Sequence, residues 1–183
     1  MKIGIFIGRM QPLHLGHQKI ITESISNNDF TFIMLGSSGI INEYNPFSDL
    51  ERKNFIENIF KEYRNKYKII NLQDSDSDEK WVKNIENIIK NNIENEIKNL
   101  TFYGGDFKND YAIKVLKEYE DILNFDDINF REISRNSIFT IHKGEKVYIS
   151  STLVRQSLLN KDLDLLEKLL DVRVFELLID KIS

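Results

Sequence analysis

The chain has 183 residues, enough for one domain with a sizeable hydrophobic core. Its hydrophobic content of 41% and charged content of 30% are typical of a soluble globular protein, and no apolar run approaches the roughly 20 residues of a membrane helix. The absence of cysteine excludes disulfides and thiolate metal sites, and the net charge of −4 argues against general binding to nucleic acid. Because the first segment also lacks the features of a signal peptide, we expect a cytoplasmic protein that does not contact a membrane.

The first predicted strand, residues 3–7, is an apolar run of the kind that a parallel sheet buries on both faces. Pro12 prevents regular structure from continuing, and Gly16 opens a helical pattern that extends to about Ser26. The chain therefore turns from a strand into a helix within a few residues. The exposed N–H groups and the dipole of such a helix start favour a phosphate group.

Two of the three histidines, His14 and His17, stand three residues apart and share one face of the first helical turn. One alternative is that one of them caps the helix while the other is a satisfied core residue. We favour a phosphate site, because Gly8 closes the strand and Arg9 adds a positive charge beside the pair. Since the net charge is negative, a phosphate ligand needs such locally placed cations, and Arg52 and Arg155 are further candidates.

The rest of the chain alternates between strand and helix patterns. Strands are predicted at residues 30–35, 67–72, 100–103 and 128–133. One helix is predicted to begin at a capping box formed by Ser48 and Glu51 and to end at about Tyr63. Residues 79–98, 111–120 and 162–182 are also predicted to be helical, and another helix is predicted to begin at Ser150. Residues 138–148 carry no clear pattern. The alternation predicts an α/β fold: a single domain, residues 1–183, with a doubly wound parallel sheet, a helical C-terminus and ligands beyond the carboxyl ends of the strands.

A second candidate site lies in the segment Ile149-Ser150-Ser151-Thr152-Leu153-Val154-Arg155. Hydroxyl and N–H groups at a helix start can bind a phosphate, and Arg155 follows Ser151 by one turn with a planar fork that suits phosphoryl oxygens. Taken alone, the segment also fits an ordinary capped helix with a surface arginine.

Together these segments resemble a known family. The string Gly8-Arg9-Met10-Gln11-Pro12-Leu13-His14-Leu15-Gly16-His17 resembles the HxGH nucleotidyltransferase superfamily, and the later segment resembles its ISxTxxR signature. The first string looks most like the nicotinamide-mononucleotide adenylyltransferases of the archaeal and bifunctional-bacterial type, with Met10 where those proteins usually have Phe. The resemblance implies a Rossmann-like fold.

It also implies an enzyme of NAD biosynthesis that joins nicotinamide mononucleotide to the AMP moiety of ATP and releases pyrophosphate. His14, His17 and Arg155 would be the catalytic residues, and Mg²⁺ would be held mainly through the ATP phosphates, without a metal site made by the protein alone. The resemblance assigns ATP binding to the following residues: Gly8, Arg9, Met10, His14, His17, Gly104, Asp106, Ile149, Ser150, Thr152 and Arg155.

The resemblance also implies the mononucleotide site. Asp74 and Trp81 match an acidic residue and a tryptophan of the archaeal type, and Asn45 and Arg52 belong to a segment similar to NPFxxxER. A tryptophan face attracts the cationic pyridinium by ~0.5–2 kcal/mol. The acidic loop, residues 74–78, should repel a carboxylate, so we expect the amide substrate to be preferred over nicotinic acid mononucleotide. The alternative for Trp81 is an anchor of its helix in the core.

Two other functions fit the same residues. One is a different transfer on the same fold, by a pantetheine-phosphate adenylyltransferase or a cytidylyltransferase. The other is a regulator that binds a nucleotide without catalysis. The family resemblance further leads us to expect a homo-oligomer, and no Nudix activity because the pattern of that hydrolase is absent from the sequence.

Overall fold

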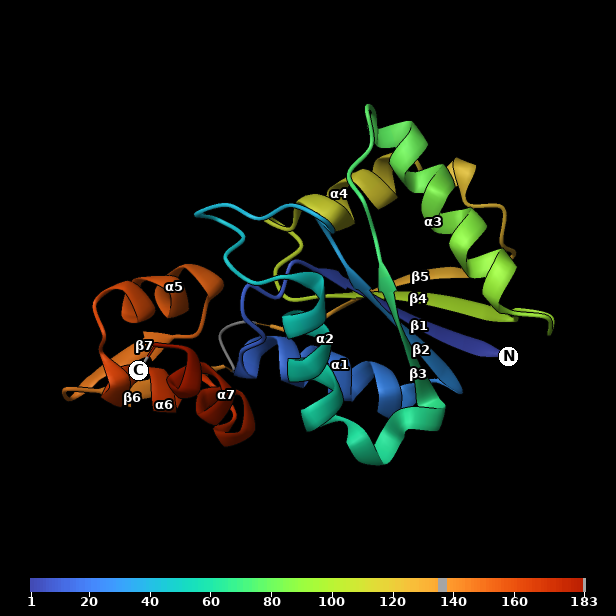
Figure 1. Cartoon of the computed structure of the whole chain (residues 1–183). Coiled ribbons are helices and arrows are strands. Elements are labelled where there is room, and N and C mark those ends of the chain that lie inside the picture. Colours follow the sequence, from blue (N-terminus) through green and yellow to red (C-terminus); the bar gives the residue numbers. More distant parts are fainter. Residues whose placement is uncertain (135–137, 183) are drawn as a thin grey trace.

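The computed structural model describes residues 1–134 and 138–182. Its centre is a five-stranded sheet in the order β3-β2-β1-β4-β5, with every neighbouring pair parallel (Figure 1). The strands are β1 (Lys2–Gly8), β2 (Phe30–Leu35), β3 (Tyr67–Asn71), β4 (Asn99–Gly104) and β5 (Ile128–Glu132). The chain moves outward from β1 to β3 and then returns to the other side of β1, so the strand order reverses between β1 and β4. This confirms the predicted doubly wound sheet and places a ligand crevice at the reversal point.

Helices cover both faces of the sheet (Figure 1). On one face lie α1 (Leu15–Asn27) and α2 (Asp49–Ile59), and on the other lie α3 (Asp78–Asn92) and α4 (Tyr111–Glu118). Short 3-10 segments, Lys61–Lys66 and Glu120–Ile122, follow α2 and α4. The C-terminal elements lie beyond the carboxyl end of the sheet, beside α1 and α2, and α7 packs on α2. They are β6 (Phe139–His142), β7 (Glu145–Tyr148), α5 (Ser151–Leu159), α6 (Leu163–Leu169) and α7 (Val172–Ile182).

The sheet separates two hydrophobic cores, because successive side chains of a strand point to opposite faces. Ile5 and Phe32 belong to the core beneath α3 and α4. Phe6 and Ile33, the next residues along, belong to the core shared by α1, α2 and the C-terminal helices. Both faces of the central strands are therefore buried, which is why their sequences are continuous apolar runs.

The structure differs from the sequence predictions at the ends of two helices. The helix predicted over residues 79–98 ends at Asn92, and the chain then runs back beside the N-terminus, where the N–H of Lys98 donates to the Met1 carbonyl at 2.9 Å. The helix from Ser48 ends at Ile59 rather than about Tyr63. Residues 162–182 are helical as predicted, and they form two helices, α6 and α7. Residues 139–148, which carried no clear pattern, form an antiparallel hairpin.

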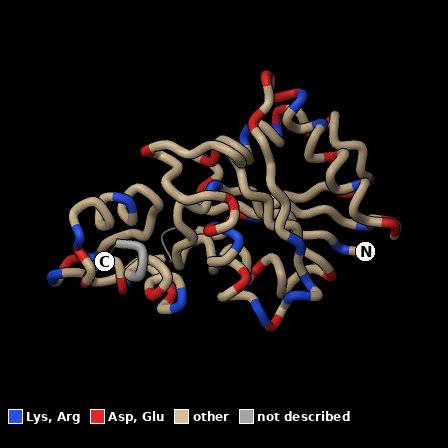
Figure 2. Tube along the Cα trace, viewed as in Figure 1, with Lys and Arg blue, Asp and Glu red and all other residues tan. Residues whose placement is uncertain are grey.

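Charged side chains of both signs are interspersed along the helices and loops, while most of the sheet is uncharged (Figure 2). Among the described residues, no helix combines the length and apolar character needed to cross a bilayer.

Gly4 allows α1 to pack closely on β1, and this contact gives the first testable prediction. A Cβ at Gly4 would lie 2.2 Å from Ser24 Oγ and 2.6 Å from Asn28 Nδ2, both of which belong to buried, hydrogen-bonded side chains. Gly4→Ala should therefore lower the free energy of unfolding in urea by about 1–3 kcal/mol, the usual cost of overpacking a core. Gly36→Ala is the control, because its Cβ would meet only ordinary contacts at 3.9 Å. Equal losses in the two variants would contradict this account of α1 packing.

Candidate active site

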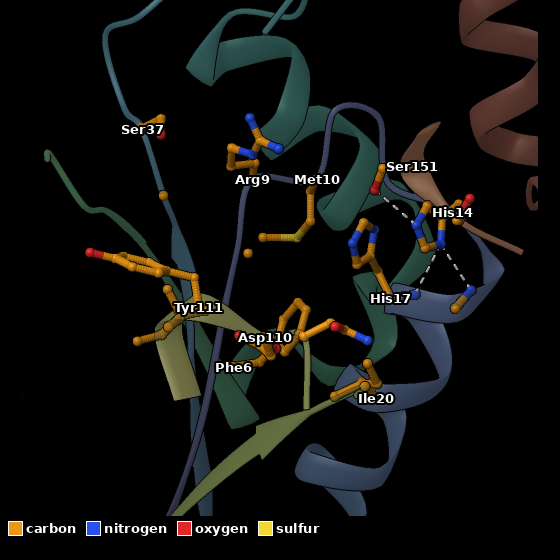
Figure 3. Close-up of a pocket in the computed structure, with 18 of the residues that line it drawn as sticks. Phe6, Arg9, Met10, His14, His17, Ile20, Ser37, Asp110, Tyr111 and Ser151 are labelled. Carbon is orange, nitrogen blue, oxygen red and sulfur yellow. Dashed lines mark hydrogen bonds between the residues drawn. The ribbon is translucent and has the colours of Figure 1, made fainter. Parts of the chain in front are cut away.

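A cavity of about 650 Å³ opens at the carboxyl ends of the strands, where the strand order reverses. Both sequence motifs reach it, although they lie at opposite ends of the chain. Ten of the predicted site residues line the cavity: Gly8, Arg9, Met10, His14, His17, Asp74, Trp81, Ile149, Ser150 and Arg155. Figure 3 shows His14, His17 and Ser151 on one side of it, and Ser37 and Tyr111 across from them.

The segment between β1 and α1 is held by a buried glutamine. The side-chain amide of Gln11 donates to the carbonyl of Phe47 at 2.9 Å and accepts the N–H of Phe47 at 2.8 Å. This paired contact joins the turn after β1 to the segment before α2. Met10, beside it, has a φ of 48°, and its buried side chain belongs to the core shared by α1, α2 and the C-terminal helices. Sequence analysis missed Gln11, since no local pattern reveals a partner 36 residues away.

His14 caps α1 with its own ring. Its Nδ1 accepts the backbone N–H groups of Gly16 at 3.1 Å and His17 at 3.3 Å, so this nitrogen carries no proton and the ring proton lies on Nε2. Nε2 in turn lies 3.1 Å from Ser151 Oγ (Figure 3). A Cβ at Gly16 would lie 2.9 Å from the ring, which explains the glycine between the histidines. The cap therefore aims a ring N–H donor at the start of α5.

The ring of His17 stacks on the ring of His14, with the centroids 3.7 Å apart and the planes at 17°. Phe6 lies against its other side, at 5.9 Å between centroids. The two stacked imidazoles thus lie side by side at the wall of the cavity, as Figure 3 shows. The sequence predicted a shared face for the pair, and the structure has it.

The second motif starts α5 at this wall. Ser150 Oγ accepts the N–H of Leu153 at 3.2 Å and caps the helix. Ser151 lines the cavity and contacts His14, whereas Thr152, predicted to bind ATP, is exposed and lies outside the cavity lining. The reason is helical geometry, because adjacent residues point about 100° apart on a helix and only one of the two can face the histidines.

Arg155 follows one turn later and faces the same cavity as Arg9. Burial lowers the pKa of the Arg155 guanidinium, and the neighbouring positive charge of Arg9 lowers it further. Both effects act against the positive charge of Arg155, and a bound anion would offset them. Two like charges at one wall therefore make this part of the cavity suited to a ligand with several negative charges.

Acidic and aromatic side chains line another part of the cavity. Asp74 accepts a hydrogen bond from Ser37 Oγ at 3.3 Å, and Asp78 accepts one from the Tyr111 hydroxyl at 2.7 Å. This hydrogen bond, together with slight burial and the negative charge nearby, raises the pKa of Tyr111. Trp81 lines the cavity and also packs against the core beneath α3 and α4, so it serves as both a helix anchor and part of the wall.

Arg52 and Asn45 do not line the cavity, contrary to the substrate-binding roles expected for them. The Arg52 side chain has no exposed surface, and it donates to the carbonyls of Arg9 and Gly36 rather than to the cavity. Asn45 is buried in its own turn, where its backbone and side chain both donate to Asn42 Oδ1. Arg52 thus lies on the buried side of α2, where it contacts the backbone that follows β1 and β2.

Gly104 and Asp106 also lie outside the cavity lining. A Cβ at Gly104 would meet Ile113 and Phe107 at 2.9 Å, so the absence of a side chain there leaves room for these two residues. Asp106 accepts the N–H of Asp110 on its carbonyl at 2.7 Å and closes a turn. The loop instead reaches the cavity through Gly105, Asn109, Asp110, Tyr111 and Ala112, which sequence analysis did not single out.

The described residues show no group of three or more His, Asp or Glu side chains placed to hold a metal ion. The cations and imidazoles at one wall instead suit phosphate oxygens, which can themselves carry a metal ion into a site.

A protein-family model described as cytidylyltransferase-like matches residues 5–157. The nicotinamide-nucleotide adenylyltransferase of Thermoplasma volcanium is 33% identical over 82 residues, which are 44% of this chain and 46% of that protein. The nicotinamide/nicotinic acid mononucleotide adenylyltransferase of Acinetobacter baylyi is 30% identical over 119 residues, covering 63% of this chain and 62% of that protein. The chain thus spans about half the length of the first of these curated relatives.

Solved structures share the fold at lower identity. The bifunctional NMN adenylyltransferase/ADP ribose pyrophosphatase of Francisella tularensis superposes with a TM-score of 0.64 at 23% identity, over 87% of this chain and 42% of that one. The same protein has been solved in complex with AMP and a manganese ion.

Proposed function

The chain belongs to the cytidylyltransferase-like family, and from this premise we propose that it is an adenylyltransferase that joins nicotinamide mononucleotide to ATP, giving NAD and pyrophosphate. The observation that carries the proposal is the convergence of His14, His17 and Arg155, from opposite ends of the chain, on one cavity that Trp81 also lines. The names of the curated relatives support this choice of substrates.

In the proposed reaction, a phosphate oxygen of the mononucleotide attacks the α-phosphorus of ATP. A new P–O bond forms, the bond from the α-phosphorus to the bridging oxygen of the β-phosphate breaks, and the electron pair leaves with pyrophosphate. Such a transfer needs in-line positioning and neutralisation of charge more than an acid or a base. The cavity wall has groups that could do this: the Nε2–H of His14, whose Nε2 lies 3.1 Å from Ser151 Oγ, the ring of His17, and the guanidinium groups of Arg9 and Arg155.

ATP would bring Mg²⁺ on its phosphate oxygens, where the ion would neutralise part of the charge on the leaving group. The donor set at this wall fits a metal-bound polyphosphate, because its cationic and imidazole groups would bind phosphate oxygens. Asp74 and Asp78 would instead contact the other substrate, with Trp81 beneath the cationic pyridinium ring. The single-domain boundaries, the homo-oligomer and the cytoplasmic location remain predictions.

The test is pyrophosphate release from ATP and Mg²⁺ with one acceptor at a time: nicotinamide mononucleotide, nicotinic acid mononucleotide, phosphopantetheine or glycerol phosphate. We expect release with the first, in step with NAD formation, and a lower kcat/KM with the second because its carboxylate meets Asp74 and Asp78. Pyrophosphate release only with phosphopantetheine or only with glycerol phosphate would show that this compound, and not nicotinamide mononucleotide, is the acceptor. ATP binding without release would favour a nucleotide-binding regulator.

Trp81→Ala should raise the KM for nicotinamide mononucleotide about tenfold and leave the KM for ATP nearly unchanged, because the lost cation–π contact involves only the pyridinium. Steady-state kinetics with each substrate varied in turn measures the difference. Trp81→Phe should retain most of the affinity, since it keeps an aromatic face. Phe125→Ala is the control for packing, because Phe125 contacts the same core but lies outside the cavity lining. Equal changes in both KM values for Trp81→Ala would show that the residue only anchors its helix.

A further inference from the structure

The buried guanidinium of Arg52 connects two strand ends that border the cavity. Its Nη1 donates to the carbonyl of Arg9 at 2.7 Å and to the carbonyl of Gly36 at 2.8 Å. Arg9 follows β1 and Gly36 follows β2, and both residues line the cavity. A single nitrogen therefore joins two loops that both line the cavity.

The partner of Arg52, Asp49, extends the connection to a third strand. Arg52 Nη2 lies 2.6 Å from Asp49 Oδ1, and the same carboxylate accepts a hydrogen bond from the Ser38 hydroxyl and the N–H of Gly39 at 3.3 Å. Asn71, the last residue of β3, donates to Asp49 Oδ2 at 3.0 Å. Although burial raises the pKa of Asp49, the hydrogen bonds from Ser38, Arg52 and Gly39 outweigh it and leave the pKa below its usual value. The carboxylate therefore stays charged while it holds the loop after β2.

A contribution to the stability of the fold does not by itself explain the buried ion pair of Asp49 and Arg52. Removing a guanidinium from water costs free energy that the attraction to a carboxylate only partly recovers, and well-packed apolar residues often do as well. The hydrogen bonds of Arg52 instead end on backbone atoms at the cavity. Ser37, next to Gly36, has a φ of 48° and donates to Asp74, so the position of this loop also reaches the acidic part of the cavity. The two backbone contacts of Arg52 thus end on residues that line the cavity.

We propose that Asp49 and Arg52 form a clamp beneath the cavity, and that Arg52 is a positioning residue that sets Arg9 and the loop at residues 36–39 for nucleotide binding. The clamp acts without touching the substrates. Its link to ATP rests on the proposed function, whereas its effect on the two loops does not.

The first measurement is amide hydrogen exchange of the ligand-free protein. In Arg52→Met, exchange should accelerate at residues 9–11 and 36–39 while β4 and α3 keep their protection. Glu86→Gln is the matched control, because Glu86 is also a buried carboxylate in an ion-paired network, with Lys83 and Lys90, but lies outside the cavity lining. Faster exchange over the whole domain in Arg52→Met would overturn the clamp and show a general loss of stability.

The second measurement is ATP affinity by titration calorimetry, below the melting temperature of each variant. Arg52→Lys keeps the positive charge but loses the planar guanidinium group. It should raise the Kd for ATP about tenfold, as expected when charged hydrogen bonds are misplaced. In the Arg9→Ala background, Arg52→Lys should reduce the affinity for ATP much less, because the Arg9 side chain that it misplaces is already absent. Additive losses would overturn the positioning of Arg9. If the wild type binds no ATP while exchange changes locally, the proposed function fails and the clamp stands.

Discussion

His17→Ala should lower the turnover of ATP and nicotinamide mononucleotide by about 10²–10³, the usual cost of removing one donor that stabilises transition-state charge. The ring of His17 lies in the cavity wall, stacked on His14 at 3.7 Å and backed by Phe6. It is therefore held in place before a ligand arrives. The KM values should change less than kcat, because the charge on the α-phosphoryl group develops mainly in the transition state.

Two variants make this prediction specific. His17→Asn keeps a side-chain N–H donor of smaller reach and should lose less activity than His17→Ala. His142→Ala is the matched control, because His142 lies outside the cavity lining, between Asp162 and Asp164 of the α6 region. Circular dichroism and thermal unfolding would confirm that each variant is folded. Near-normal turnover in folded His17→Ala would remove the role assigned to its ring.

Arg155→Ala should lower kcat/KM for ATP by about 10²-fold, because in the proposed reaction its planar fork would bind the oxygens of the departing pyrophosphate. Arg155 is partly buried beside Arg9, and both its burial and that neighbouring charge lower its pKa. A bound polyanion relieves this repulsion, so the guanidinium should contribute more in the complex than in the free protein. The measurement is initial rate against ATP concentration at saturating mononucleotide.

Arg155→Lys separates charge from shape. It keeps the positive charge but cannot make two parallel hydrogen bonds, so its activity should fall between wild type and Arg155→Ala. Arg131→Ala is the matched control, since Arg131 pairs with Glu23 at 3.5 Å and lies outside the cavity lining. A loss in Arg131→Ala equal to that in Arg155→Ala would show a general effect of net charge instead of a phosphate contact.

Sequence alone predicted the features that depend on neighbours along the chain. The apolar run of β1 and the turn into α1 placed His14 and His17 at a strand end, and Ser48 with Glu51 formed the expected capping box. Alternating strands and helices predicted the parallel sheet, because each helix must cross over before the next parallel strand. From this alternation came the position of the site at the carboxyl edge of the sheet. The shared site of the two motifs was implied by the family resemblance, and local patterns did not predict it.

Tertiary structure decided which atoms face the cavity. Arg52 carries the same charge as Arg9 and Arg155, yet the rotation of α2 turns it beneath the strand ends, where it binds backbone carbonyls. Ser151 rather than Thr152 meets His14, because a one-residue step on a helix changes the direction of a side chain. Tyr111, 67% exposed and without a motif around it, reaches the cavity only because α4 starts beside Asp78. Local patterns encode where elements begin and end, whereas the partners of each side chain depend on segments that folding brings together.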